Sequence, residues 1–83
     1  MDRLKLLKKI IGGSKNIRFA DMVHLIRGFG FELSRTEGSH HIFFRPDIPE
    51  LVNLQNVKGQ AKTYQIRQFL KLVEKHDLKL EDK

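Results

Sequence analysis

Apolar residues recur at three- and four-residue spacing in three stretches of this sequence, and that pattern limits the chain to a fold with three amphipathic helices. Gly12 and Gly13 end the first stretch, and either Gly28 or Gly30 can take the left-handed conformation that ends the second. Thr63 can cap the third. We therefore expect helices over residues 2–11 and 18–27 and from about residue 63 onward.

Between the second and third helices, apolar and polar residues alternate in short runs, which is typical of β-strands. Glu37, Gly38 and Ser39 supply turn residues between the first two runs, and Pro46 ends the second run. A polar loop centred on Gly59 follows the third run and leads to the last helix. The predicted strands cover residues 31–36, 40–45 and 51–55, and the predicted loop covers residues 56–62.

This order of elements predicts an α+β fold in which helices cover one face of a three-stranded antiparallel sheet. The 83 residues suit one domain. Within it we expect an N-terminal helix extension over residues 1–13, a core over 14–76 and a charged tail over 77–83 that frays. Cysteine is absent, so disulfides are excluded. The apolar runs are too short to span a bilayer and no secretory signal pattern is present, so we expect a cytoplasmic protein that contacts no membrane.

The formal net charge is +6, and its distribution along the chain is uneven. Basic residues concentrate in residues 1–20 and 58–75, whereas the centre is close to neutral. A surplus of lysine and arginine favours polyanion partners, because phosphate contacts release condensed counterions. Arg67, Lys71 and Lys75 are four residues apart and therefore share one outward face of the last helix. Such a face is either simply solvated, or it contacts RNA or an acidic protein surface.

The second predicted strand carries large apolar residues on both of its faces. Side chains alternate along a strand, which divides this run into two sets. The two sets are His40, Ile42 and Phe44 on one face, and His41, Phe43 and Arg45 on the other. One exposed aromatic side chain explains this pattern simply. A partner that covers the second face explains it equally well.

Two adjacent histidines directly follow Gly38 and Ser39. Glycine permits close approach of a phosphate, and an imidazole at the start of the strand can reach a ribose 2′-hydroxyl while the sheet anchors it. Histidine titrates near neutral pH, which suits proton transfer, although a structural role is the competing interpretation. His40 and His41 point to opposite faces and cannot easily share an ion, and no residue spacing matches a zinc site. We therefore expect neither a metal nor a cofactor.

Four segments of the chain resemble the HicA family, the toxin half of HicAB toxin–antitoxin pairs. The segments are residues 21–31, residues 38–43 with the sequence Gly-Ser-His-His-Ile-Phe, residues 52–55 and residues 59–70. Thr63 stands where the family often has proline, a departure that a helix start tolerates. The resemblance implies a double-stranded-RNA-binding-like fold and ribosome-independent cleavage of mRNA. It also implies one catalytic histidine, which maps onto His40, and a HicB antitoxin that covers the active site.

On this basis His40 is the predicted catalytic residue. It acts either as general base on a ribose 2′-hydroxyl or as general acid to the leaving oxygen, without a metal. Lys58 and Lys62 are expected to hold the phosphate, and Ser39 is expected to donate a hydrogen bond at the turn. The full set of predicted RNA-binding residues is Gly38, Ser39, Lys58, Lys62, Arg67 and Lys71.

Two other classes of function fit the same sequence. One is a non-catalytic RNA-binding module, for which basic helix faces and a sheet are equally suitable. The other is a structural protein that only docks on a partner, which predicts no salt-dependent affinity for RNA. For the toxin itself we expect a monomer in the absence of its antitoxin.

Overall fold

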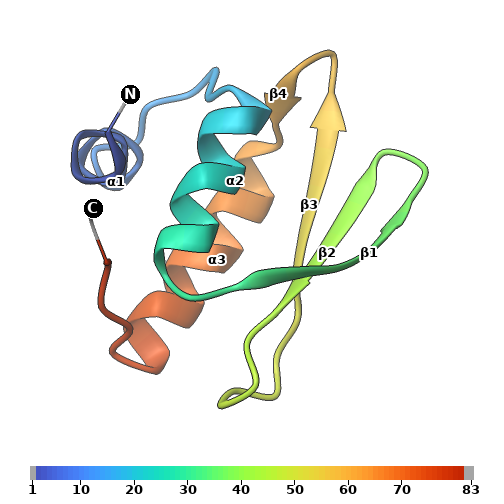
Figure 1. The fold of residues 1–83 in the computed structure, drawn as a ribbon. Coiled ribbons are helices and arrows are strands. Elements are labelled where there is room, and N and C mark those ends of the chain that lie inside the picture. Colours follow the sequence, from blue (N-terminus) through green and yellow to red (C-terminus); the bar gives the residue numbers. More distant parts are fainter. Residues whose placement is uncertain (1, 82–83) are drawn as a thin grey trace.

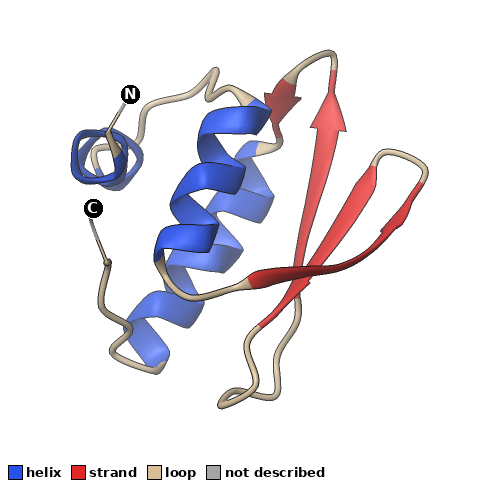
Figure 2. Cartoon of the chain, viewed as in Figure 1, coloured by secondary structure: helices blue, strands red, loops and turns tan. Residues whose placement is uncertain are grey.

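The chain folds into layers, with helices on one side and an antiparallel sheet on the other (Figures 1 and 2). This computed structural model describes residues 2–81. The predicted α+β class is confirmed, and the arrangement is consistent with that of double-stranded-RNA-binding domains. In chain order the elements are α1 (Arg3–Ile11), α2 (Phe19–Gly28), β1 (Glu32–Glu37), β2 (His40–Phe44), β3 (Val52–Val57), β4 (Gln60–Ala61) and α3 (Thr63–Lys75).

The sheet has four strands in the order β1-β2-β3-β4, with each neighbouring pair antiparallel. The prediction of three strands and a polar loop over residues 56–62 is therefore wrong, because this segment completes β3, turns and forms β4. Lys58 and Gly59 occupy the turn with φ of 53° and 83°, and positive φ at both positions closes a tight hairpin. Asn56 Oδ1 accepts a hydrogen bond from the Gly59 amide at 2.8 Å. This hairpin is stabilised by backbone pairing and its residues are mostly polar. The sequence therefore shows no alternation of apolar and polar residues in this segment.

Of the two capping predictions, the one for the end of α2 is confirmed and the one for the start of α3 is wrong. α2 ends at Gly28, and Gly30 takes the left-handed conformation with φ of 90° while its amide donates to the Arg27 carbonyl at 2.9 Å. The prediction that Thr63 caps α3 is wrong. Lys62 occupies the cap position without a side-chain hydrogen bond, and Thr63 is already the first helical residue.

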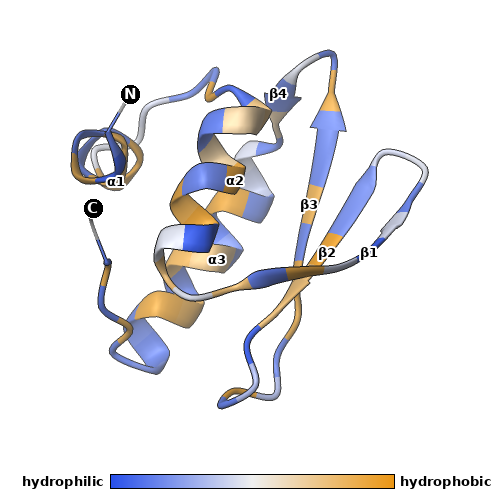
Figure 3. Ribbon diagram, viewed as in Figure 1, coloured by the Kyte–Doolittle hydropathy of each residue, from blue (hydrophilic) through white to orange (hydrophobic). Residues whose placement is uncertain are grey.

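One hydrophobic core fills the space between the helices and the sheet. Figure 3 shows apolar residues on α2, α3 and the strands that cross beside them. The Phe69 ring of α3 meets Phe29 and Phe31 edge-on, with ring centroids 5.5 and 5.7 Å apart. Full burial of each such side chain contributes about 1.5–3 kcal/mol. Other large side chains that are fully buried are Leu6, Ile17, Met22, Leu25, Ile26, Phe43 and Leu54.

Both ends of the described chain pack against this core. α1 buries Leu6 and Ile10 beside α2, and Arg3 Nε donates to the His24 carbonyl at 2.8 Å. Leu78 is buried, and the Glu81 amide donates to the Gly28 carbonyl at 2.8 Å. The expectation of a fraying tail is therefore wrong for residues 77–81, and residues 82–83 lie outside the described part.

Across residues 2–81, the helices are too short or too polar to cross a membrane.

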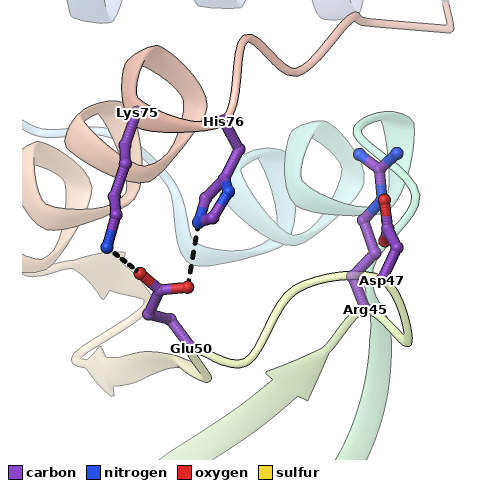
Figure 4. Close-up of polar contacts among 5 residues, drawn as sticks. All are labelled: Arg45, Asp47, Glu50, Lys75 and His76. Atoms are coloured by element: carbon purple, nitrogen blue, oxygen red, sulfur yellow. Dashed lines mark hydrogen bonds and ion pairs between the residues drawn. The ribbon is translucent and has the colours of Figure 1, made fainter.

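A polar cluster joins the loop after β2 to the end of α3 (Figure 4). Glu50 accepts from Lys75 Nζ at 2.6 Å and lies 2.9 Å from His76 Nε2. Hydrogen bonds from Lys75 and then His76 lower the pKa of the Glu50 carboxyl to about 2. Lys75 therefore forms an ion pair within the protein. It is not a purely solvated member of the helix face that was predicted for Arg67, Lys71 and Lys75.

Candidate active site on the open face of the sheet

The turn between β1 and β2 is hydrogen-bonded to β3 through both the backbone and the side chain of Ser39. Gly38 has φ of 59°, a conformation that glycine adopts without strain, and no atom lies within 4 Å of the place where a Cβ would stand. The Ser39 carbonyl accepts from the Asn56 amide at 3.0 Å. The Ser39 hydroxyl accepts from Gln55 Nε2 at 3.2 Å. The turn is thus both open to solvent and held in place.

His40 begins β2 and points to the face of the sheet that lies away from α2 and α3, which we call the open face. It pairs with Gln55 of β3, and its Nδ1 lies 3.2 Å from Asn53 Oδ1. An amide oxygen only accepts, so this contact requires a proton on Nδ1, and in the neutral ring the lone pair is then on Nε2. The half-buried ring is held in this orientation on the strand.

His41 lies on the opposite face, as strand alternation predicts. Its ring centroid is 4.7 Å from that of Phe19 at the start of α2, and its Nδ1 lies 3.2 Å from the Ser39 carbonyl oxygen. The two histidines thus meet different surroundings, with His41 packed in the helix layer and His40 on the open face.

A β-bulge in β1 adds charged side chains to the open face. Leu33 pairs with Phe43, whereas Arg35 pairs with Ile42, so one extra residue interrupts the register between them. Arg35 and Glu37 consequently share the open face, and Glu37 lies directly opposite His40.

Arg35 is held toward this position by an ion pair, since its Nε lies 2.5 Å from Glu37 Oε2. The guanidinium is therefore drawn along the strand toward the residue that faces His40. Sequence reasoning missed Arg35, Asn53 and Gln55 because their proximity to His40 depends on strand register. Alternation within β3 was the available signal, since it sets Asn53 and Gln55 opposite the buried Val52 and Leu54.

Of the two lysines predicted to hold the phosphate, Lys58 lies in a turn that is linked by hydrogen bonds to the turn before His40. It is exposed in the β3–β4 turn, and Asn56 links that turn to Ser39. Lys62 lies at the start of α3, in the helix layer, with Nζ 5.7 Å from the centre of the half-exposed Tyr64 ring. The two lysines therefore flank β4, with Lys58 in the turn before it and Lys62 directly after it.

The buried Gln65 side chain fixes the start of α3 against β3. It is 2% exposed and its Oε1 accepts from the Gln55 amide at 2.7 Å. Further along α3, Arg67 and Lys71 are exposed in the helix layer, across the sheet from the His40 ring. The structure thus sets Gly38 and Ser39 directly before His40 and joins the turn of Lys58 to Ser39 through Asn56, whereas Arg67 and Lys71 lie in the helix layer.

The apolar side chains of β2 on the open face are less exposed to solvent than strand alternation suggests. Ile42 is 8% exposed and Phe44 is half-buried within the chain itself. Phe43, on the other face, is part of the core.

Among residues 2–81 no three His, Cys, Asp or Glu side chains are grouped so that they could hold a metal ion.

Comparison with known families identifies the segment from α2 into α3. The sequence profile described as HicA toxin of bacterial toxin-antitoxin matches residues 19–74, more than half of the chain. The chain belongs to the HicA toxin family. The match begins at the first residue of α2 and ends inside α3, so α1 of this HicA toxin lies outside the matched segment. No curated protein and no solved structure matched the chain.

Proposed function

We propose that this HicA toxin is a metal-independent endoribonuclease that cleaves mRNA in the cytoplasm and so blocks translation. The observation that carries the proposal is the His40 ring on the open face, with Nδ1 held by Asn53 and Nε2 left basic. A histidine that served only to pack the core would not need to lie on the open face. The neighbouring His41 already packs against Phe19 of α2.

In this mechanism His40 Nε2 removes the proton of a ribose 2′-hydroxyl. The 2′-oxygen then attacks the adjacent phosphorus, the bond from phosphorus to the 5′-oxygen breaks, and that oxygen leaves with a proton from solvent or from the imidazolium. The products are a 2′,3′-cyclic phosphate and a 5′-hydroxyl. One general base of this kind contributes about 10²–10⁴-fold to the rate.

Charge that develops on the phosphate needs a cation nearby. Arg35 shares the open face, and Lys58 extends from the adjoining turn. Gly38 leaves room for a phosphate beside the turn, and Ser39 is placed to contribute a hydroxyl. We propose these four residues as contacts of the cleaved linkage, with Lys62 and the helix-layer residues Arg67 and Lys71 contacting RNA outside it.

The test is RNA cleavage by the purified protein in excess chelator, with the products analysed for cyclic phosphate ends. His40→Ala is expected to lose about 10²–10⁴-fold in rate. His24→Ala is the matched control, because His24 is an exposed histidine on α2 whose ring has no part in the mechanism. Normal cleavage by His40→Ala would falsify the catalytic assignment. Retention of RNA without cleavage by the unmodified protein would instead favour a non-catalytic RNA-binding module.

Membership of a toxin–antitoxin family also indicates a protein antitoxin. We propose a HicB-type antitoxin that covers the open face, where it would block access to His40. Co-expression should yield a complex in which the His40 ring is shielded, and size-exclusion chromatography should give a monomer for the toxin alone. A complex that cleaves RNA at the rate of the free toxin would contradict this placement.

A further inference from the structure

The helix outside the family match is basic and rigidly placed. α1 presents Lys5, Lys8 and Lys9 to solvent, while its buried leucine and isoleucine fix it against α2. Residues 2–20 contain a single acidic side chain, Asp2, and its carboxylate already accepts from the Lys5 amide at 2.8 Å. The lysines of α1 therefore form a positive surface with a defined position in the fold.

A polar hollow of about 460 Å³ connects α1 to the start of α2. Lys9 from the helix and Arg18 from the end of the connection both line it, together with Asn16 and with Asp21 of α2. Asn16 has φ of 61°, so the connection bends sharply at this hollow. Within residues 2–81 neither Lys9 nor Arg18 forms an ion pair. Both cations are therefore available to an anion from outside the chain.

Backbone hydrogen bonds continue from this hollow to the candidate active site. Arg18 forms a β-bridge with Gln60, so the connection runs beside β4. The Phe19 amide donates to the Gly59 carbonyl at 2.9 Å, which places Arg18 next to the turn that contains Lys58. That turn is joined through Asn56 to Ser39, the neighbour of His40. In Figure 1 the α1–α2 connection and the two hairpin turns lie toward the same end of the molecule.

We infer that RNA flanking the cleaved linkage follows this edge, from the His40 turn past Lys58 to Arg18 and Lys9. We call the three cations Lys9, Arg18 and Lys58 the basic edge. Its partner is the sugar–phosphate backbone, which needs cations in a row and no base-specific pocket. α1 thereby lengthens the RNA footprint beyond the segment that defines the family. This inference rests on the proposed ribonuclease function.

The basic edge can be tested separately from catalysis. In the His40→Ala background, single-stranded RNA binds without being cut, and affinity is measured against salt concentration by fluorescence anisotropy. Each phosphate contact on single-stranded nucleic acid contributes about 0.7 to the slope of log affinity against log salt. Lys9→Gln with Arg18→Gln should therefore lower the slope by about 1.4 and the affinity by roughly tenfold at physiological salt.

Arg27→Gln with Lys79→Gln is the matched control, since it also removes one exposed arginine and one exposed lysine but away from the basic edge. It should change the slope by less than half as much. With His40 intact, the Lys9 and Arg18 double variant should keep its kcat, because the reacting groups are untouched. Its KM should rise for long RNA and stay unchanged for a short oligonucleotide that spans only the His40 turn.

The outcomes separate the two proposals. Equal slopes for the double variant and its control, in a protein that cleaves RNA normally, would overturn the basic edge and leave the nuclease intact. A protein that never cleaves RNA but shows the slope change would keep the edge as an RNA-binding surface and overturn the catalytic proposal. Equal melting temperatures of the two double variants establish that both are folded.

Discussion

The hydrogen bond between His40 Nδ1 and Asn53 Oδ1 makes the most specific prediction. Replacing Asn53 with leucine removes the acceptor at 3.2 Å that holds the proton on Nδ1. The ring is then free to rotate and to populate the tautomer whose Nε2 is protonated and cannot act as a base. A neutral hydrogen bond of this kind contributes about 0.5–1.5 kcal/mol. Since 1.36 kcal/mol is tenfold in rate, Asn53→Leu should cleave RNA about two- to tenfold more slowly.

Replacing Asn53 with aspartate separates positioning from structure. The carboxylate still accepts from Nδ1, and a charge-assisted hydrogen bond is about twice as strong as a neutral one. A negative charge beside the ring favours the imidazolium, so the acidic limb of the pH–rate profile should move to higher pH. At a pH above that limb, Asn53→Asp should cleave faster than Asn53→Leu. A purely structural asparagine predicts no movement of the limb in either variant.

The assay combines pH–rate profiles with ¹⁵N NMR of the imidazole nitrogens, which reports the tautomer directly. Gln68→Leu is the control, because it removes an exposed amide and adds an exposed leucine on α3, in the helix layer. The reasoning is refuted if Asn53→Leu retains the unmodified rate, the same acidic limb and a His40 ring protonated on Nδ1.

Two further predictions concern stability. Hydrogen bonds from Lys75 and His76 depress the pKa of Glu50 to about 2, so the carboxylate stabilises the fold above the unfolded-state pKa near 4.5 and this contribution is lost as pH falls toward 2. Glu50→Gln should therefore melt below the unmodified protein at pH 7, with a difference that shrinks between pH 4.5 and 2; a constant difference across that range would count against the linkage. Gly38→Ala should cost roughly 1–2 kcal/mol in denaturant unfolding, because a left-handed φ strains any residue with a Cβ. Gly13→Ala, also at positive φ with open space around it, should cost a similar amount, and an unchanged midpoint for Gly38→Ala would show that the turn relaxes.

The helices and the three longer strands could be predicted because each has a periodic apolar pattern. The faces of His40 and His41 followed from the same rule, since two neighbours in a strand always diverge. β4 could not be predicted in this way, because two residues are too few for a period and its pairing with Asn56 and Val57 is a tertiary contact. The ordered tail was missed because Leu78 and Leu80 alternate with charged residues over too short a run to indicate burial, and only the folded core supplies their partners.

The same distinction applies to the candidate site, where local features could be predicted and cross-strand contacts could not. The Gly-Ser-His sequence identified the turn and the imidazole, because turn chemistry and strand parity are local. Asn53 contacts His40 from β3, and Arg35 shares the open face with it from β1, so their positions depend on cross-strand register. The Arg67 and Lys71 face was predicted from helix periodicity, which gives exposure but says nothing about which side of the sheet the helix occupies.

The extra residue in β1 has a consequence for how this hairpin tolerates change. Because one residue is inserted between Leu33 and Arg35, everything from Arg35 to the turn is rotated by half a period relative to the start of the strand. Deleting Ser34 would restore regular alternation, with Arg35 directly after Leu33, and would leave Arg35 opposite Ile42 and Glu37 opposite His40. The strand can therefore lose one residue at this point without moving either charged side chain to the other face. Two toxins that differ by one residue here would present the same charged side chains to RNA.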